Sequence, residues 1–242
     1  IILISNDTIF GTIGGGNLEY LVIDEARRLI DNNIANKVMN IPLGPGIGQC
    51  CGGYVQVKLS LHNNSKDALK KEYVVNYIKP NLYIFGSGHI GQALISKLEN
   101  INFNTFIIDS REDYLKMTNI KDINYLLSKK PWEIVSKLED NSYFIVLTHS
   151  HDYDLKILNE ILKKNNTFVG LIGSLTKKKR FYKRLIDNGH NKSIVEKIEC
   201  PIGIDIGNSK DPNEIAFSII TRIISIKNKL KHLSNNKIKE VI

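Results

Sequence analysis

Two adjacent cysteines in a glycine-rich segment are the residues with the clearest chemical potential. The stretch Gly44–Gly53 holds five glycines and one proline around Cys50 and Cys51. Glycines allow positive φ angles and close approach of a ligand, and successive backbone N–H groups favour a thiolate over a thiol. Thiolates are ligands for soft transition metals, whereas adjacent cysteines without a partner pair do not match a zinc site. We predict that Cys50 and Cys51 are metal ligands, with Cys51 favoured to face the site, and that Gln49 and Gly52 help to bind a cofactor. The alternative for one cysteine of the pair is a small buried apolar residue.

A second candidate site is the sequence Gly86-Ser87-Gly88-His89-Ile90-Gly91, between a predicted strand and a predicted helix. In that context the pattern is typical of dinucleotide binding, because the glycines let the backbone and the helix N-terminus approach a pyrophosphate. Asp109 ends the next predicted strand, where its carboxylate can accept a hydrogen bond from a ribose 2′-OH. Arg111 suits a 2′-phosphate instead, so NAD(H) and NADP(H) both remain open. The alternative is a Rossmann-like fold without a nucleotide. The predicted binding residues are Gly86, Gly88, His89, Ile90, Gly91, Asp109 and Arg111.

Two further segments follow predicted strands. Thr148–Asp152 contains His149 and His151, which are candidate catalytic residues because a His-x-His pair can ligate a metal or transfer protons. The alternative is a loop of hydrogen-bonding histidines in which Asp152 caps the next helix. In the second segment, Gly173, Ser174 and Lys177 are predicted to bind an anionic cofactor at a helix N-terminus, and the alternative is an exposed basic helix face.

The elements that position these residues fall into two groups. Residues 1–78 predict a smaller α+β domain that carries the Cys-Cys loop. Its expected elements are a hairpin over Ile1–Ser5 and Thr8–Ile13, a helix over Asn17–Asn33 with Asn17 as N-cap, strands at Lys37–Leu43 and Tyr54–Leu61, and a linking helix over Asp67–Ile78.

Residues 79–228 predict an α/β domain with a Rossmann-like, doubly wound parallel sheet, because short apolar strands alternate with helices. Residues 229–242 predict a frayed, basic C-terminal tail. The expected strands are Leu82–Phe85, Thr105–Ile108, Tyr143–Leu147 and Phe168–Ile172, and the expected helices are His89–Leu98, Asp154–Lys164, Thr176–Arg184 and Pro212–Ile226.

Composition narrows the class of protein. The 242 residues are 42% hydrophobic and 24% charged, which is ordinary globular composition. The net charge of +8 is spread along the chain, so we do not expect nucleic-acid binding. No apolar run reaches the roughly 18 residues needed for a membrane span. Three cysteines cannot form a disulfide framework, and together with reactive thiols they predict a cytoplasmic protein.

Together these motifs resemble the xanthine dehydrogenase accessory proteins, the XdhC/CoxI family. The resemblance extends from residue 8 to about residue 226, and we expect the family's opening helix and strand to be missing before Ile1. The matching segments are Gly11–Glu19, Leu43–Gly53, Phe85–Gly91 with Asp109–Arg111, Thr148–His151, Gly170–Arg180 and Cys200–Gly203.

The resemblance implies a role in maturing a molybdenum hydroxylase such as xanthine dehydrogenase. The chain would bind molybdopterin, the molybdenum cofactor, support its sulfuration and deliver it to the apoenzyme, as a chaperone more than a catalyst. A cysteine desulfurase is a further candidate partner, and a monomer and a homodimer both remain open. Two alternatives stay open: an NAD(P)-dependent oxidoreductase that uses His149 or His151 as proton donor, and a nucleotide-gated binding module without catalysis.

Overall fold

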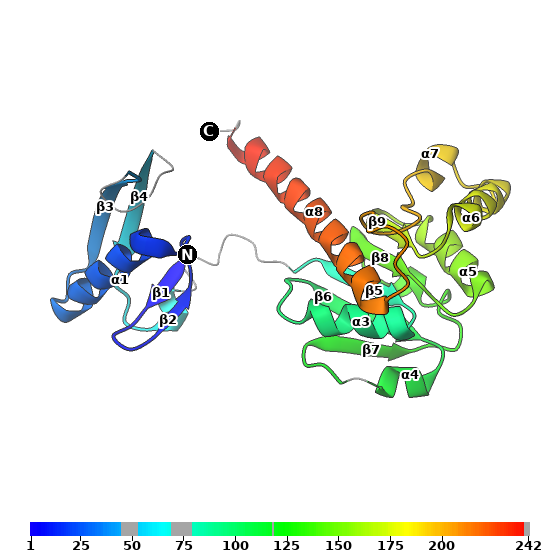
Figure 1. Ribbon diagram of the computed structural model, residues 1–242, viewed down its shortest axis with the longest axis horizontal. Helices are drawn as coiled ribbons and strands as arrows, with labels where there is room; N and C mark the ends of the chain where they lie inside the picture. Colours follow the sequence, from blue (N-terminus) through cyan, green and yellow to red (C-terminus); the bar gives the residue numbers. More distant parts are fainter. Residues whose placement is uncertain (45–52, 69–78, 118, 240–242) are drawn as a thin grey trace. The chain divides into compact units, whose positions relative to one another are not determined.

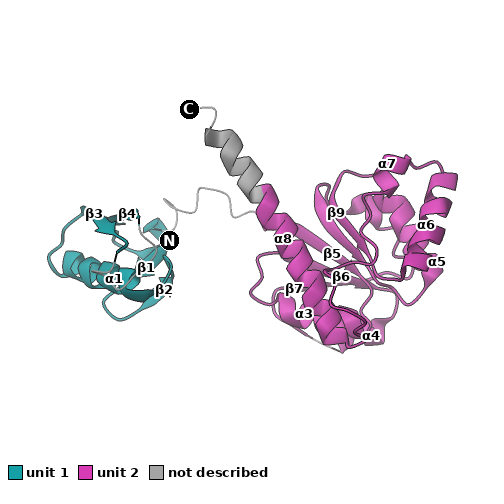
Figure 2. Cartoon of the chain, turned by 45° about the horizontal axis from the view of Figure 1, so that its top comes forward, with its two compact units in different colours: residues 1–77 teal, residues 78–242 magenta. Residues whose placement is uncertain are grey.

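The computed structural model describes residues 1–44, 53–68, 79–117 and 119–239, and it divides the chain into two compact units, Ile1–Tyr77 and Ile78–Ile242 (Figure 2). The predicted linking helix lies mostly outside the described residues. No helix within the described ranges has the length and apolar character that a membrane span requires.

The first unit is the predicted smaller α+β domain (Figure 1). Strands β1 (Ile2–Ile4) and β2 (Ile9–Gly11) form an antiparallel hairpin, helix α1 covers Gly16–Asp31, and β3 (Asn36–Pro42) pairs antiparallel with β4 (Tyr54–Ser60). Helical spacing on α1 and alternation along β3 and β4 bring one apolar face of each element together. The core that results consists of Leu18, Val22, Leu29, Ile41 and Leu59.

The start of α1 differs from the prediction. Asn17 lies inside the helix, and the N-cap is Gly15, which makes no side-chain capping hydrogen bond. Instead, the carboxylate of Glu19 accepts hydrogen bonds from the backbone N–H of Ile13 (2.9 Å) and of Gly15 (3.2 Å). The side chain of Thr12 donates to the same oxygen, at 2.5 Å. A glutamate in the first turn therefore fixes the entering chain, as helix N-termini favour negative charge.

The second unit is built on a five-stranded parallel sheet with the order β7-β6-β5-β8-β9. This confirms the predicted Rossmann-like architecture. The strands are β5 (Asn81–Phe85), β6 (Asn104–Asp109), β7 (Ile123–Leu127), β8 (Ser142–Val146) and β9 (Asn166–Leu171). The helices are α3 (His89–Leu98), α4 (Glu112–Lys116), α5 (His151–Ile161), α6 (Leu175–Asp187), α7 (Lys192–Val195) and α8 (Pro212–Lys239), with a 3-10 turn, η2, at Val135–Lys137.

Both faces of the sheet are buried, which explains why its central strands are continuous apolar runs. In β5, Leu82 and Ile84 point into the core that contains α3 and α8, and Tyr83 and Phe85 point into the opposite core with α5 and α6. Figure 1 shows α3 and α8 packed together. The two helix layers leave the strand ends as the accessible edge of the sheet.

Several elements of this unit differ from the sequence prediction, which also lacked the short helices α4 and α7. Strand β7 was not predicted although its sequence, Ile-Asn-Tyr-Leu-Leu, is largely apolar; it lies at the edge of the sheet, where its residues are partly exposed. Helix α8 continues to Lys239, so the predicted frayed tail over 229–242 is wrong for most of its length: no glycine or proline follows Pro212 to end the helix. Helix α5 begins at His151 rather than Asp154.

The early start of α5 places Asp154 in a buried ion pair. The Lys177 ammonium lies 2.6 Å from a carboxylate oxygen of Asp154, and the two side chains are 8% and 0% exposed. Lys177 also donates to the carbonyl of Ile172 at 2.9 Å, and the second oxygen of Asp154 accepts from the N–H (3.0 Å) and the hydroxyl (2.7 Å) of Thr148. The pair therefore connects α5, α6 and the segments that follow β8 and β9.

We predict that Lys177→Met lowers the free energy of unfolding of the second unit by about 3 kcal/mol, because it leaves Asp154 buried without its cation. Urea unfolding measures the change. Lys179→Met, at an exposed position of the same helix, is the matched control and should change stability by no more than about 0.5 kcal/mol. Equal stabilities of the two variants would show that the buried pair is not a structural requirement.

Candidate functional site

The carboxyl ends of β5, β6 and β8 meet in one place and line a shallow pocket at the edge of the sheet. The chain passes from β5 outward through β6 to β7, then returns to the other side of β5 for β8 and β9. Doubly wound sheets bind ligands where the strand order reverses in this way. The pocket is lined by Gly86, Ile108, Asp109, Ser110, Pro131, Thr148, His149 and Tyr153.

The three glycines of the turn after β5 have different structural roles. A β-carbon at Gly91 would lie 2.1 Å from the carbonyl oxygen of Gly86, and one at Gly86 would lie 2.4 Å from the carbonyl oxygen of Leu147. Gly86 also has a φ of +117°, which disfavours any side chain. These two glycines are therefore required by the packing of β5, α3 and the end of β8.

Gly88 is not required by packing. Its φ is −74°, and a β-carbon there would meet no atom within 4 Å. It is the N-cap of α3 and has no side chain to occupy the space in front of the helix N-terminus, where His89 and Ile90 begin the helix. The fold thus explains Gly86 and Gly91 but not Gly88, and an open approach to backbone N–H groups is what a pyrophosphate needs.

The carboxylate of Asp109 lies at the centre of a hydrogen-bond network. One oxygen accepts from the N–H of Ser87 (2.7 Å) and the Nη2 of Arg111 (2.8 Å). The other oxygen accepts from the N–H (2.9 Å) and the Nε (3.0 Å) of Arg111. The side chain of Asp109 is 2% exposed. The network fixes the end of β6 against the glycine turn, so the predicted pair Asp109 and Arg111 does lie at the site.

The electrostatics of Asp109 follow from this network. Desolvation by burial is the largest influence and raises the pKa of the carboxyl. The hydrogen bonds from Arg111 and from the N–H of Ser87, together with the positive charge of Arg111, outweigh it and hold the pKa below its ordinary value of 3.8. The guanidinium of Arg111 also lies over the ring of Tyr114, 3.7 Å from its centroid. Asp109 is therefore ionised at neutral pH, with its charge compensated by Arg111.

The two candidate histidines occupy different surroundings. His149 is exposed, lines the pocket and contacts the ring of Tyr153 edge to face, at 5.4 Å between centroids. His151 does not line the pocket, and its Nδ1 lies 2.9 Å from Nη2 of Arg180. Because a guanidinium only donates, Nδ1 of His151 must accept, and the ring proton then resides on Nε2. The structure therefore separates the pair, and of the two only His149 faces the candidate nucleotide site.

The structure shows some features of the second predicted anion site, at the N-terminus of α6. Ser174 is the N-cap of α6, its hydroxyl accepting from the N–H of Lys177 at 3.3 Å, and Gly173 has a φ of +152°. The Lys177 ammonium, however, has two protein partners, Asp154 and the carbonyl of Ile172. Direct contact of Lys177 with a phosphate stays a prediction.

The remaining candidates are the four residues of the Cys-Cys loop, Gln49, Cys50, Cys51 and Gly52, which lie outside the described residues. Within the described ranges, no group of three or more His, Cys, Asp and Glu side chains is arranged to hold a metal ion. Cys200 is 2% exposed, and desolvation by burial raises the pKa of its thiol, so this cysteine is structural.

Sequence reasoning missed Asp154 and misassigned the cap of α5. Ser150, not Asp152, is the N-cap, its hydroxyl accepting from the N–H of Tyr153 at 3.4 Å. Asp152 instead pairs with Lys156 on the helix surface, at 2.8 Å. The available signal for Asp154 was an acidic residue in helical register with the core residues Ile157, Leu158 and Ile161, because a carboxylate on that side must find a partner.

The fold and the glycine turn define a Rossmann-like domain with an open ligand edge. A model of the XdhC Rossmann domain matches residues 82–223, more than half of the chain, and the chain therefore belongs to this family.

Two curated relatives are similar to it. The uncharacterized protein YqeB of Escherichia coli is 24% identical over 228 residues, which cover 93% of this chain and 39% of YqeB. A probable xanthine dehydrogenase subunit of Bacillus subtilis is 27% identical over 154 residues, which cover 63% of this chain and 44% of that protein. The chain thus spans less than half the length of these relatives.

A solved structure has the same fold: a xanthine dehydrogenase from Bacillus halodurans superposes with a TM-score of 0.78 at 19% identity, covering 94% of this chain and 86% of that one.

We predict that Gly88→Ala weakens dinucleotide binding at least tenfold, about 1.4 kcal/mol, because a methyl group would fill the space in front of the helix N-terminus. Titration calorimetry measures the affinity. The variant should melt at the wild-type temperature, whereas Gly91→Ala, the comparison variant, should destabilise the unit by about 1–3 kcal/mol through overpacking. Wild-type affinity in a folded Gly88→Ala protein would contradict a role of Gly88 in binding.

We also predict an acid-sensitive contribution of Asp109 to stability. Because its folded pKa lies below its ordinary value of 3.8, the ionised carboxylate stabilises the fold fully above that pH, and this stabilisation is lost as the pH falls through the folded value. Urea unfolding between about pH 5 and pH 2 should show a steeper loss of stability in the wild type than in Asp109→Asn. Parallel pH profiles would mean that the carboxyl is not selectively stabilised in the native state.

Proposed function

We propose that this chain is an accessory protein in the maturation of a molybdenum hydroxylase of the xanthine dehydrogenase type, and that its second unit binds a dinucleotide. The observation that carries the proposal is membership of the XdhC family through the Rossmann domain at residues 82–223. The curated relative named as a xanthine dehydrogenase subunit supports the association with that enzyme. In this proposal the partner is the apoenzyme of the hydroxylase.

The geometry of the second unit supports the proposal that it binds a dinucleotide. The space in front of Gly88 gives a pyrophosphate access to the N-terminus of α3, and a β-carbon at that position would partly fill it. Asp109 and Arg111 stand at the end of the neighbouring strand, where a Rossmann fold holds the adenosine ribose. When bound, NAD(H) or NADP(H) would supply redox chemistry or a conformational signal.

The two cysteines of the first unit support the proposal that the chain binds the molybdenum cofactor. Two adjacent thiols within a glycine-rich sequence suit a soft metal or its sulfur ligand. Cys50 and Cys51, with Gln49 and Gly52, would hold molybdopterin while it receives sulfur from a cysteine desulfurase. The role is binding and transfer more than catalysis.

The experiment that tests this function is cofactor retention. The full chain is incubated with molybdenum cofactor released from a molybdoenzyme and passed through gel filtration, and bound pterin is measured by fluorescence. The wild type should retain pterin. Replacing the ligand cysteine by serine substitutes a harder, poorly ionised oxygen, so retention should fall about tenfold for one of Cys50→Ser and Cys51→Ser, with Cys51→Ser the expected one.

Thermal melts control for folding, and the two serine variants control for each other, since only one of the two cysteines is expected to be the ligand. Equal retention by wild type, Cys50→Ser and Cys51→Ser at equal melting temperature would remove the ligand role from this loop. Failure of the wild type to retain pterin would contradict the cofactor-binding function itself.

A further inference from the structure

The carboxylate of Asp109 already has a full set of donors. A carboxylate offers about four acceptor positions, and here they are taken by the N–H of Ser87 and by the N–H, Nε and Nη2 of Arg111, at 2.7–3.0 Å. A ribose 2′-OH that donated to Asp109 would have to displace one of these donors. The carboxylate that would recognise an unphosphorylated ribose is therefore already hydrogen-bonded within the protein.

The group that faces solvent at this position is Arg111. Its side chain is 29% exposed, against 2% for Asp109. Two of its N–H groups are bound to Asp109, and the ring of Tyr114, 3.7 Å from the guanidinium carbon, holds the plane of the group. A guanidinium so fixed keeps further N–H donors in a rigid fork, which is the geometry that phosphate oxygens accept from.

A second cation lies beside the same turn. The ammonium of Lys129 donates to the carbonyl of Ser110 at 3.1 Å, and Lys129 is exposed. Of the acidic residues that follow, Glu112 is engaged by Lys116 at 2.6 Å. Arg111 and Lys129 thus flank Ser110, which itself lines the pocket at the carboxyl edge of the sheet.

We infer that the nucleotide site selects a dinucleotide with a 2′-phosphate on its adenosine ribose, NADP(H) rather than NAD(H), through Arg111 and Lys129. The inference rests on the proposed dinucleotide site and adds its specificity. Asp109 is then a positioning residue: it orients Arg111 and is itself shielded from the ligand. The phosphate accepts from the outer N–H groups of Arg111 and from Lys129, and a bare 2′-OH gains neither charge-assisted bond.

Titration calorimetry of the full chain with NADP⁺, NAD⁺, 2′,5′-ADP and 5′-AMP tests the inference. The wild type should bind NADP⁺ at least tenfold more tightly than NAD⁺, and 2′,5′-ADP more tightly than 5′-AMP by a similar factor. Lys129→Gln should weaken NADP⁺ about fivefold and leave NAD⁺ unchanged. Arg111→Gln should abolish the preference, but it also removes donors from a buried carboxylate, so its folding is checked by thermal melting.

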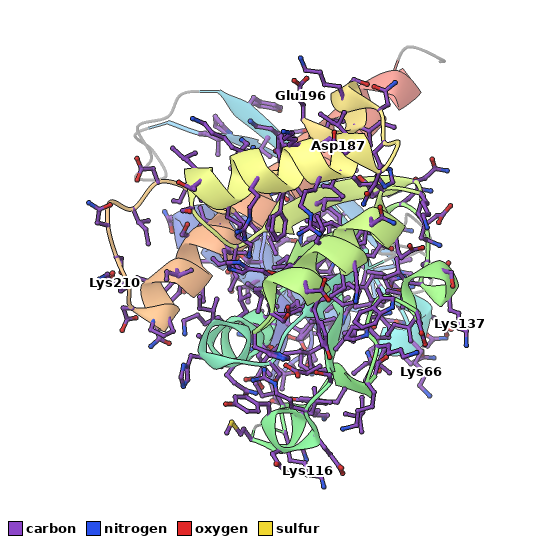
Figure 3. The ribbon with its side chains drawn as sticks, turned by 90° about the vertical axis from the view of Figure 1, so that its right-hand side faces the viewer. Lys66, Lys116, Lys137, Asp187, Glu196 and Lys210 are labelled. Atoms are coloured by element: carbon purple, nitrogen blue, oxygen red, sulfur yellow. The ribbon has the colours of Figure 1, made fainter. Side chains whose placement is uncertain are left out.

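The matched control is Lys137→Gln, which removes one exposed lysine from η2 with the same change of net charge (Figure 3 labels Lys137 at the outer edge of the view). It should leave all four affinities unchanged. Equal or tighter binding of NAD⁺ by the wild type would overturn the inference and leave the dinucleotide site standing. Absence of binding of either dinucleotide at millimolar concentration would overturn the site and the inference together.

Discussion

The close contact of the first turn of α3 with the end of β5 is the constraint on which the second unit depends. Gly91 sits so near the carbonyl of Gly86 that no side chain fits between them, and Gly86 itself lies against the carbonyl of Leu147 after β8. Strand, turn and helix are therefore brought together by backbone atoms alone, at the point where the strand order reverses. Because the N-terminus of α3 is fixed there, its N–H groups face the open space at Gly88 rather than the core.

Two buried carboxylates, Asp109 and Asp154, fix the loops at this edge of the sheet. Asp109 joins the end of β6 to the glycine turn through the N–H of Ser87, and Asp154 joins the segment after β8 to α6 through Thr148 and Lys177. A buried charge is tolerated only with its partners in place, so each carboxylate holds its loop in one arrangement. The partly exposed Arg111 and the exposed His149 at this edge are supported by a scaffold whose buried side-chain polar atoms all have partners among the described residues. A Rossmann-like fold by itself does not imply this, since folds persist without their ligands.

The sequence predicted the elements whose signal is local and missed those that depend on distant partners. The apolar strands β5, β6, β8 and β9 and helix α3 follow from burial on both faces and from the glycine turn. Strand β7 was missed although it is largely apolar, and it lies partly exposed at the edge of the sheet. Helix α8 continues through a polar stretch that has no apolar pattern to predict it. Of the site, the positions of Gly88, Asp109 and Arg111 followed from spacing. The mutual engagement of Asp109 and Arg111, and the pairing of Asp154 with Lys177, could not, because each depends on geometry that only the folded chain provides.

Mapping the residues that a dinucleotide contacts is the most direct test of the proposed site. Backbone amide resonances of the isotopically labelled chain, followed by heteronuclear NMR during titration with NADP⁺, report contact residue by residue. We predict that the largest shifts fall on the amides of Gly88, His89 and Ile90 at the start of α3, with a second group at Arg111 and His149. Shifts confined to other parts of the chain, or no shifts at saturating ligand, would contradict the assignment of this strand edge as the nucleotide site.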